Sequence, residues 1–367
     1  MTKTAVILFN LGGPNKKESI KPFLFNFFMD KNIIRLPLPF RYLLAKKIST
    51  SRSRGEANDS YKELGFKSPL LENTNAQAEV LEKKLGSDFK VFTCMRYWHP
   101  MAKEVVQKVK KYAPKKIILL PLYPQFSTTT TCSSFEAWDQ AASQVGIDVP
   151  TSGLCCYPLN NGFIKASAEN IKTLYQKAQK DGHKNPRILF SAHGLPEKII
   201  KDGDPYQWQC EQAAEKIAHR LSVILNDSEG SHATKPGDSS VASLPQNDNK
   251  NIDWQICYQS RVGRLKWIAP SLDEALEKAA RDNKAVVVYP HAFTQEHVET
   301  LVELDIEYKY MAEKLGIQGY YRAQTVGTHE DFIDGLAELV RQNLDKTGTH
   351  AENDNLCPKK FNRCCTA

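Results

Sequence analysis

The sequence has no run of roughly 18 or more apolar residues, which excludes an ordinary membrane-spanning helix. Its first residues, MTKTAVILFNLGGPNKK, run straight into a strand-like segment and lack the layout of a signal peptide. It also has no basic stripe and no nucleic-acid-binding motif, although the net charge is +7. We therefore expect a cytoplasmic protein that does not bind nucleic acid, and the charge weakly favours an anionic partner such as a membrane surface.

With 367 residues, 41% of them hydrophobic and 25% charged, the composition is that of a soluble globular protein. The chain is long enough for two domains, because single cores stop growing near about 250 to 300 residues. Disulfides are rare in the cytoplasm, so the nine cysteines need another explanation. Three of them, Cys357, Cys364 and Cys365, lie within the last eleven residues.

Short β-branched runs alternate with longer helical patterns, which predicts an α/β fold with parallel strands. Strands are expected at residues 5–9, 90–94, 116–120, 149–156, 187–191, 254–258, 284–289 and 318–322. Helices are expected at residues 74–85, 163–180, 206–225, 296–315 and 330–344. Eight strands predict about four in each of two domains, residues 1–160 and 161–345, followed by a Cys-rich tail, residues 346–367. Whether the last helix packs on the first domain is left open.

Two segments depart from this alternation. Residues 226–252 are rich in Ser, Asn, Asp, Gly and Pro, which predicts a disordered surface insertion. Residues 20–54, here called the lip, combine aromatic and aliphatic side chains with a basic end. The lip is either a core helix followed by a loop, or an apolar cover for a large ligand that can rest on a bilayer.

One histidine stands where a predicted buried strand stops. The apolar run of residues 188–190 ends in Ser191-Ala192-His193-Gly194. In open α/β sheets, ligands bind outside the carboxyl ends of the strands, so His193 is expected to face a crevice. A lone histidine is more often structural than catalytic. The residues at the neighbouring strand ends therefore decide which role His193 has.

The strand predicted at residues 284–289 leads into a segment with Glu299, Glu303 and Glu307 at every fourth residue. On an α-helix these three carboxylates, here called the acidic ladder, would share one face and span roughly 12 Å. A solvated charged face is one interpretation, but no Lys or Arg is interleaved before Lys309. The other interpretation is a ladder that holds cations or passes protons, with Glu299 in reach of His193 if their strands are neighbours.

Other strand ends add aromatic and hydroxyl groups. They supply Arg96, Tyr97 and His99; Tyr123, Ser127 and residues 128–131; and Gln259, Ser260 and Trp267. Some of the threonines at 128–131 are expected to serve helix capping and turns. Together the strand ends indicate a pocket for a flat, large, mostly apolar ligand with metal or proton chemistry at its centre.

Five motifs resemble the signatures of the ferrochelatase family, in order and at similar distances, between residue 5 and about residue 344. They are FNLGGP, YPQFSTTT, FSAHGLP, YQSRVG…KW and FTQEHVETLVELDIEY. The resemblance implies a bacterial enzyme with two similar Rossmann-like domains, each a roughly four-stranded parallel sheet flanked by helices, and a porphyrin cleft between them. It also implies insertion of Fe²⁺ into protoporphyrin IX to give heme, the last step of heme biosynthesis.

Carried over to this chain, the resemblance implies that His193 accepts pyrrole protons or binds the metal, with Glu299 facing it and Glu303 as a further metal contact. The porphyrin-binding positions that it implies are Leu11, Arg96, Tyr97, Tyr123, Ser127, Ser260, Trp267 and Phe293. The order of metal binding and deprotonation stays open, as does the choice between monomer and homodimer. Protoporphyrin and heme dissolve poorly in water, so weak peripheral contact with the inner face of a membrane is expected through the lip.

Two rival functions remain. A related chelatase would act on a more polar tetrapyrrole, such as sirohydrochlorin or coproporphyrin, and would share the fold and the histidine. A porphyrin carrier without activity would be expected to lose the acidic ladder, which is complete here.

The tail resembles the C-terminal extension with which some ferrochelatases hold a 2Fe-2S cluster. The implied ligands are Cys357, Cys364 and Cys365, with Cys156 as the fourth because Thr128 stands where animal enzymes have the internal cysteine. Cys155 and Cys132 are alternatives for the fourth ligand. A tail with incidental thiols, or with zinc, is the competing interpretation. Cys94, Cys210 and Cys257 are expected to be ordinary buried or helix-face cysteines.

Overall fold

The computed structural model describes residues 3–230, 252–261, 263, 265–353 and 356–365. The predicted insertion therefore lies mostly outside the described residues. Its first five residues continue a helix that ends at Gly230, and Ile252 packs against a hydrophobic core cluster. Within the described residues no helix combines the length and the apolar character needed to cross a membrane.

The first half of the chain forms a five-stranded parallel sheet in the order β2-β1-β3-β4-β9. Its strands are β1 (Thr4–Asn10), β2 (Phe89–Met95), β3 (Lys116–Pro121), β4 (Thr151–Leu154) and β9 (Gly348–His350). The edge strand β9 comes from the tail. The sequence predicted about four strands for this sheet, which is one fewer than the sheet contains. Three residues of ordinary polarity give no strand signal, and β9 forms because β4 offers it a free edge.

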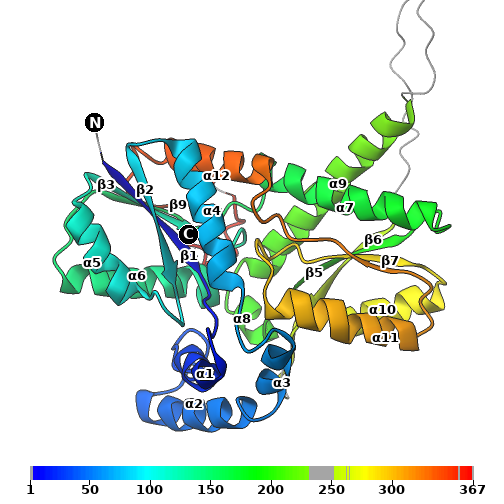
Figure 1. Ribbon diagram of the computed structural model, residues 1–367, viewed down its shortest axis with the longest axis horizontal. Helices are drawn as coiled ribbons and strands as arrows, with labels where there is room; N and C mark the ends of the chain where they lie inside the picture. Colours follow the sequence, from blue (N-terminus) through cyan, green and yellow to red (C-terminus); the bar gives the residue numbers. More distant parts are fainter. Residues whose placement is uncertain (1–2, 231–251, 262, 264, 354–355, 366–367) are drawn as a thin grey trace, which may run out of the picture.

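The second half forms a four-stranded parallel sheet in the order β6-β5-β7-β8. Its strands are β5 (Arg187–His193), β6 (Trp254–Gln259), β7 (Val286–Tyr289) and β8 (Tyr320–Arg322). The two parallel sheets with helices around them confirm the predicted α/β class (Figure 1). His193 is opposite Gln259 in the register of β5 and β6, so both stand at the same carboxyl edge of the sheet.

Helices connect the strands and cover the sheets. In the first half these are α1 (Ile20–Phe28), α2 (Leu38–Arg52), α3 (Glu56–Glu63), α4 (Leu70–Leu85), α5 (Ala102–Tyr112) and α6 (Ser133–Gln144). In the second half they are α7 (Asn161–Lys180), α8 (Glu197–Lys201), α9 (Tyr206–Gly230), α10 (Leu272–Arg281), α11 (Lys309–Lys314) and α12 (Glu330–Gln342). Three shorter segments complete them: the 3₁₀ turn η1 (Lys17–Ser19) and the π-helices η2 (Thr128–Cys132) and η3 (Glu299–Tyr308).

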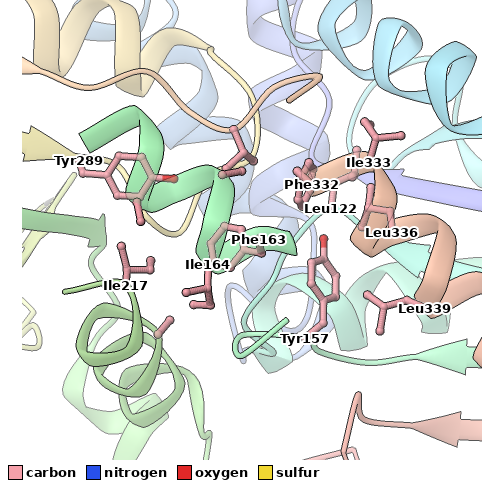
Figure 2. Packing of buried hydrophobic residues seen from close by; sticks show 14 of the residues in the cluster. Leu122, Tyr157, Phe163, Ile164, Ile217, Tyr289, Phe332, Ile333, Leu336 and Leu339 are labelled. Carbon is pink, nitrogen blue, oxygen red and sulfur yellow. The ribbon is translucent and has the colours of Figure 1, made fainter. Parts of the chain in front are cut away.

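One hydrophobic cluster runs through both halves of the chain. It contains residues of β1 and β3 as well as residues of β5 and β7. Figure 2 shows Phe163 of α7 and Phe332 of α12 among these side chains, with ring centroids 6.2 Å apart. The final helix α12 packs on both α7 and α4, which answers the open question of where it docks. This shared core fixes the two sheets relative to each other and so fixes the groups at their edges.

The lip forms α1 and α2, which pack on each other below the carboxyl end of β1 (Figure 1). Ile20, Phe23 and Phe28 are buried in a separate hydrophobic cluster with Tyr97. Val298, the residue before η3, packs against the same cluster. The lip is therefore partly core, and it lies against the beginning of the segment that bears the acidic ladder.

Candidate active site

His193 and Glu299 meet at the carboxyl edge of the second sheet. His193 is the last residue of β5 and Glu299 the first of η3, and His193 Nδ1 lies 2.8 Å from Glu299 Oε2. The two come together because β5 pairs with β7, the strand that leads toward η3. The side chains remain 36% and 22% exposed, so a small ion or a bound ring can reach them.

The acidic ladder lies on a π-helix and not on the α-helix that its four-residue spacing suggested. A π-helix closes i→i+5 hydrogen bonds, so each turn is wider and its side chains take different directions. Glu299 and Glu303 both approach Ser260, whereas Glu307 is exposed. The ladder is therefore two interior carboxylates followed by one at the surface. Short π-helical stretches occur often at functional sites.

Ser260 and Gln259 link the two interior carboxylates. The Ser260 hydroxyl donates to Glu303 Oε2 at 2.6 Å, with Glu299 Oε2 at 3.3 Å, and its backbone N–H donates to Glu303 Oε1 at 2.8 Å. Gln259 Nε2 donates to the Glu299 carbonyl and to Glu303 Oε2. Ser260 has φ 61°, in the left-handed region that a residue with a side chain seldom adopts. This conformation turns both of its donors toward one carboxylate.

The three titratable groups differ in charge state although they are close together. Burial tends to lower the pKa of His193, but the Glu299 carboxylate and its hydrogen bond outweigh burial and raise it. Burial opposes ionisation of Glu299 as well, yet the charge of His193 and its hydrogen bond to Glu299 outweigh burial and lower the pKa of Glu299 to about 2. Glu303 lacks such a partner, so burial and the Glu299 charge raise its pKa to about 7. The site thus contains an ion pair beside a carboxyl that is half protonated near neutral pH.

His297 is a further member of the site that the sequence reasoning missed. It is buried, its Nε2 lies 3.9 Å from Glu299 Oε2, and its ring lies 4.8 Å from that of Phe293. Burial lowers its pKa, so it is held neutral. The only signal in the sequence was its place two residues before Glu299 in the same motif.

The side chains of Arg96 and Tyr97 converge on Asp30 of the lip. Arg96 Nη2 donates to Asp30 Oδ2 at 2.9 Å, and the Tyr97 hydroxyl donates to the same oxygen at 2.7 Å. Tyr97 and Asp30 are buried, and the Ser133 hydroxyl hydrogen-bonds the same carboxylate. These contacts attach the lip to the end of β2. Leu11 is partly buried in the cluster next to them, and its carbonyl accepts from the Tyr97 N–H.

The predicted positions Tyr123 and Ser127 lie at the segment after β3. Ser127 is buried and Tyr123 is half-buried, and the Ser127 hydroxyl donates to the buried Asp204 at 3.0 Å. Thr128 donates to the same Asp204 oxygen through its N–H and its hydroxyl. Asp204 thus holds the turn that starts η2. This role of Asp204 was not predicted from the sequence.

Trp267 packs close to Gly194, the residue after His193. A Cβ atom on Gly194 would meet the Gln259 carbonyl at 2.9 Å and the Trp267 ring at 3.4 Å. A side chain at this position would therefore force the backbone to shift, and glycine allows the close approach. The Trp267 indole Nε1 is buried without a hydrogen-bond partner.

Five cysteines, two that directly follow β4 and three in the tail, gather in one place, here called the cysteine nest. Cys155 and Cys365 form a disulfide, Cys156 Sγ lies 3.9 Å from Cys155 Sγ, and Cys357 hydrogen-bonds Cys364. This disulfide is an exception to the expectation that disulfides are rare in this protein. The predicted buried state of Cys94, Cys210 and Cys257 is confirmed.

Throughout the described ranges, no group of three or more His, Cys, Asp or Glu side chains is arranged to hold a metal ion.

The comparisons with known proteins agree with one another. The family model described as Ferrochelatase matches residues 3–344. A protein of Rickettsia felis named Ferrochelatase is 44% identical, covering 99% of this chain and 97% of its own. A Ferrochelatase of Pelagibacter ubique is 43% identical, covering 99% and 98%, and one of a Wolbachia strain is 46% identical, covering 92% and 98%.

Solved structures share the fold at low sequence identity. SirB from Bacillus subtilis with Fe³⁺ superposes with a TM-score of 0.53 at 14% identity, covering 94% of this chain and 96% of SirB. The sirohydrochlorin chelatase SirB in complex with cobalt gives a TM-score of 0.50 at 13% identity, covering 93% and 95%. At such identities the similarity concerns the fold alone.

Proposed function

This chain belongs to the ferrochelatase family, the metal chelatases that complete heme biosynthesis, and we propose that His193 and Glu299 are the pair with which it inserts Fe²⁺ into protoporphyrin IX. The observation that supports this most is the 2.8 Å contact between the two side chains at the carboxyl edge of the second sheet. Ligands bind at this edge in open α/β sheets.

Iron insertion requires that the porphyrin lose two pyrrole protons. A neutral His193 accepts a proton from the ring, and the pair with Glu299 stabilises the imidazolium that forms. Because Glu299 is ionised at all ordinary pH values, it also attracts the Fe²⁺ substrate toward the same place. The raised pKa of His193 makes it a stronger base, but it must be neutral to accept each of the two protons, so a proton has to leave the pair within each turnover as well as after it.

Glu303 provides the route by which those protons leave. Its pKa of about 7 lets it take up and release a proton near neutral pH with little cost in either direction. Ser260, whose hydroxyl lies 3.3 Å from Glu299 and 2.6 Å from Glu303, bridges the two carboxylates. Glu307 lies at the exposed end of the same helix. The direction of proton flow is therefore from His193 toward the solvent side of η3.

The first test is turnover. Purified protein incubated with protoporphyrin and Fe²⁺ under anaerobic conditions should form heme catalytically, whereas a carrier would bind the porphyrin without turnover. Coproporphyrin and sirohydrochlorin serve as competing substrates, and preference for either of them would assign the chain to a different chelatase. Glu299, Glu303 and Glu307 are all retained, which favours the enzyme over the carrier.

The lip is proposed to contact a membrane peripherally. Three apolar side chains near the start of α2 are strongly exposed: Leu38 by 60%, Phe40 by 63% and Leu43 by 64%. The later part of α2 borders a groove of about 600 Å³, which is lined by Leu43, Lys46, Lys47, Thr50, Ser51 and Arg54. An apolar half followed by a cationic half suits an interface with anionic lipids, where the lip exchanges poorly soluble porphyrin and heme.

The cysteine nest fits a 2Fe-2S cluster only after reduction. A cluster of this kind needs four thiolates, and only three cysteines of the nest lie outside the disulfide: Cys156, Cys357 and Cys364. We therefore propose that the reduced chain holds the cluster through these three and Cys365, where it would supply a site for one electron and no step of iron insertion. Anaerobically purified, reduced protein should then contain about two irons per chain and absorb visible light. Reduced protein that is iron-free and has all five thiols of the nest open to alkylation would contradict this.

A further inference from the structure

A single buried glutamine touches both the cysteine nest and the turn after β3. The Gln209 side-chain Nε2 donates to Cys357 Sγ at 3.1 Å and lies 3.4 Å from Cys156 Sγ. Its Oε1 accepts from the backbone N–H of Phe126 at 2.7 Å. Gln209 is fully buried, so water cannot replace either partner. Its two polar ends therefore join a tail cysteine to the backbone of the YPQFST motif.

The tail also packs along the segment that contains Gln209. Phe361 lies against Trp208 with ring centroids 5.9 Å apart, and the Arg363 N–H donates to the Gly203 carbonyl at 3.2 Å. The next residue after Gly203 is Asp204, the carboxylate that accepts from Ser127 and Thr128. Tail contacts thus reach the turn before η2 by two separate routes, through Gln209 and through Asp204.

We infer that Gln209 is a positioning residue that couples the tail to the porphyrin-binding side of the first half. The inference rests on the proposed function, because Tyr123 and Ser127, which flank this turn, are proposed porphyrin contacts. An amide whose donor end is held by a sulfur and whose acceptor end is held by a backbone N–H has one favourable orientation. A change in the tail that removes the Cys357 sulfur leaves the amide only its longer contact to Cys156, which weakens that orientation and loosens the backbone at Phe126.

Two single variants and their double test this coupling. Gln209→Met keeps the length of the side chain and removes both polar ends, whereas Cys357→Ala acts only from the tail. Gln207→Leu is the matched control, since Gln207 lies on the same helix and hydrogen-bonds Glu211 instead of the tail. For each protein, hydrogen exchange is measured in the peptide of residues 124–132, and the Kd for protoporphyrin is measured by fluorescence.

We expect exchange in residues 124–132 to rise about fivefold in Gln209→Met and at least about twofold in Cys357→Ala, as for the loss of one hydrogen bond. The porphyrin Kd should weaken by similar factors, the double variant should match Gln209→Met, and Gln207→Leu should match the unchanged chain. Unchanged exchange in Cys357→Ala, or effects that multiply in the double variant, would overturn the coupling. Exchange needs no porphyrin, so failure of the wild-type chain to bind porphyrin would count against the proposed function alone.

Discussion

Ser260 directs its backbone N–H and its hydroxyl to the two oxygens of Glu303, at 2.8 and 2.6 Å. This bidentate contact holds the carboxyl group that has a pKa of about 7. Both hydrogen bonds from Ser260 favour the ionised form of Glu303 and so lower its pKa. They therefore limit the increase in that pKa that burial and the Glu299 charge cause. The bridge therefore tunes the carboxyl to a value at which it can exchange protons.

Ser260→Gly should lower the rate of iron insertion by about tenfold, because it removes the hydroxyl and keeps the backbone N–H. Glycine adopts the left-handed conformation of this residue easily, so the fold should be retained. Steady-state heme formation is the measurement, with Ser260→Ala as a second variant that lacks the hydroxyl. A loss in Ser260→Gly that Ser260→Ala does not share would mean that the hydroxyl is not the cause.

The acidic ladder should show a gradient of effects along η3. Glu299→Gln removes the partner of His193 and should lower kcat by about a hundredfold, whereas Glu303→Gln should lower it by about tenfold. Glu307→Gln, at the exposed end, is the matched control and should change kcat less than about twofold. Small and equal effects at all three positions would support the solvated-face interpretation instead.

The pH profile of Glu299→Gln should shift to the acid side. In the unchanged chain, Glu299 raises the pKa of His193 above its ordinary value, so kcat/KM should rise through a pH above 6.5 as the imidazole becomes neutral. Without the carboxylate, burial dominates and lowers that pKa, so the acid limb should move below pH 6.5. Residual heme formation between pH 5 and 9, measured for both proteins, gives the comparison. If the acid limb of the kcat/KM profile stays at the same pH in Glu299→Gln, the group that titrates is not His193.

The same pair should stabilise the fold in a defined pH window. Glu299 contributes above its ordinary pKa of 4.5 and loses its contribution as the pH falls toward about 2. His193 contributes below its ordinary pKa of 6.5 and loses its contribution as the pH rises through its raised value. Stabilisation relative to Glu299→Gln should therefore be largest between pH 4.5 and 6.5. Thermal unfolding at pH 3, 5.5 and 9 measures this difference, and a Tm gap that widens toward pH 9 would contradict it.

Membrane contact should depend separately on the two halves of α2. Phe40→Ser with Leu43→Ser should weaken binding to all vesicles by at least about tenfold, because two exposed apolar side chains are lost. Lys46→Gln with Lys47→Gln should weaken binding to anionic vesicles only, by about fivefold per residue. Val80→Ser on α4 is the control for an exposed apolar side chain outside the lip. Flotation with phosphatidylcholine vesicles, with and without phosphatidylserine, distinguishes these outcomes.

The sequence was informative where the chemistry follows from local pattern and sheet topology. The β-branched runs predicted eight of the nine strands that the described residues form, and the rule for strand ends brought His193 to the same edge as Glu299. The π-helical path of Glu299–Tyr308 could not be predicted, because its four-residue spacing fits an α-helix equally well. The buried roles of Gln209 and Asp204 depend on contacts with residues far away in the chain, which no local pattern records.

The most direct test of the central claim is the anaerobic rate of Fe²⁺ insertion into protoporphyrin by His193→Ala, measured together with the protoporphyrin Kd. His99→Ala, whose imidazole is exposed and contacts Glu104, is the matched control. If His193 is the proton acceptor, its loss lowers the insertion rate by at least about a hundredfold while the Kd stays within about threefold of the unchanged chain. Near-normal insertion by His193→Ala with intact porphyrin binding would contradict the role assigned to this residue.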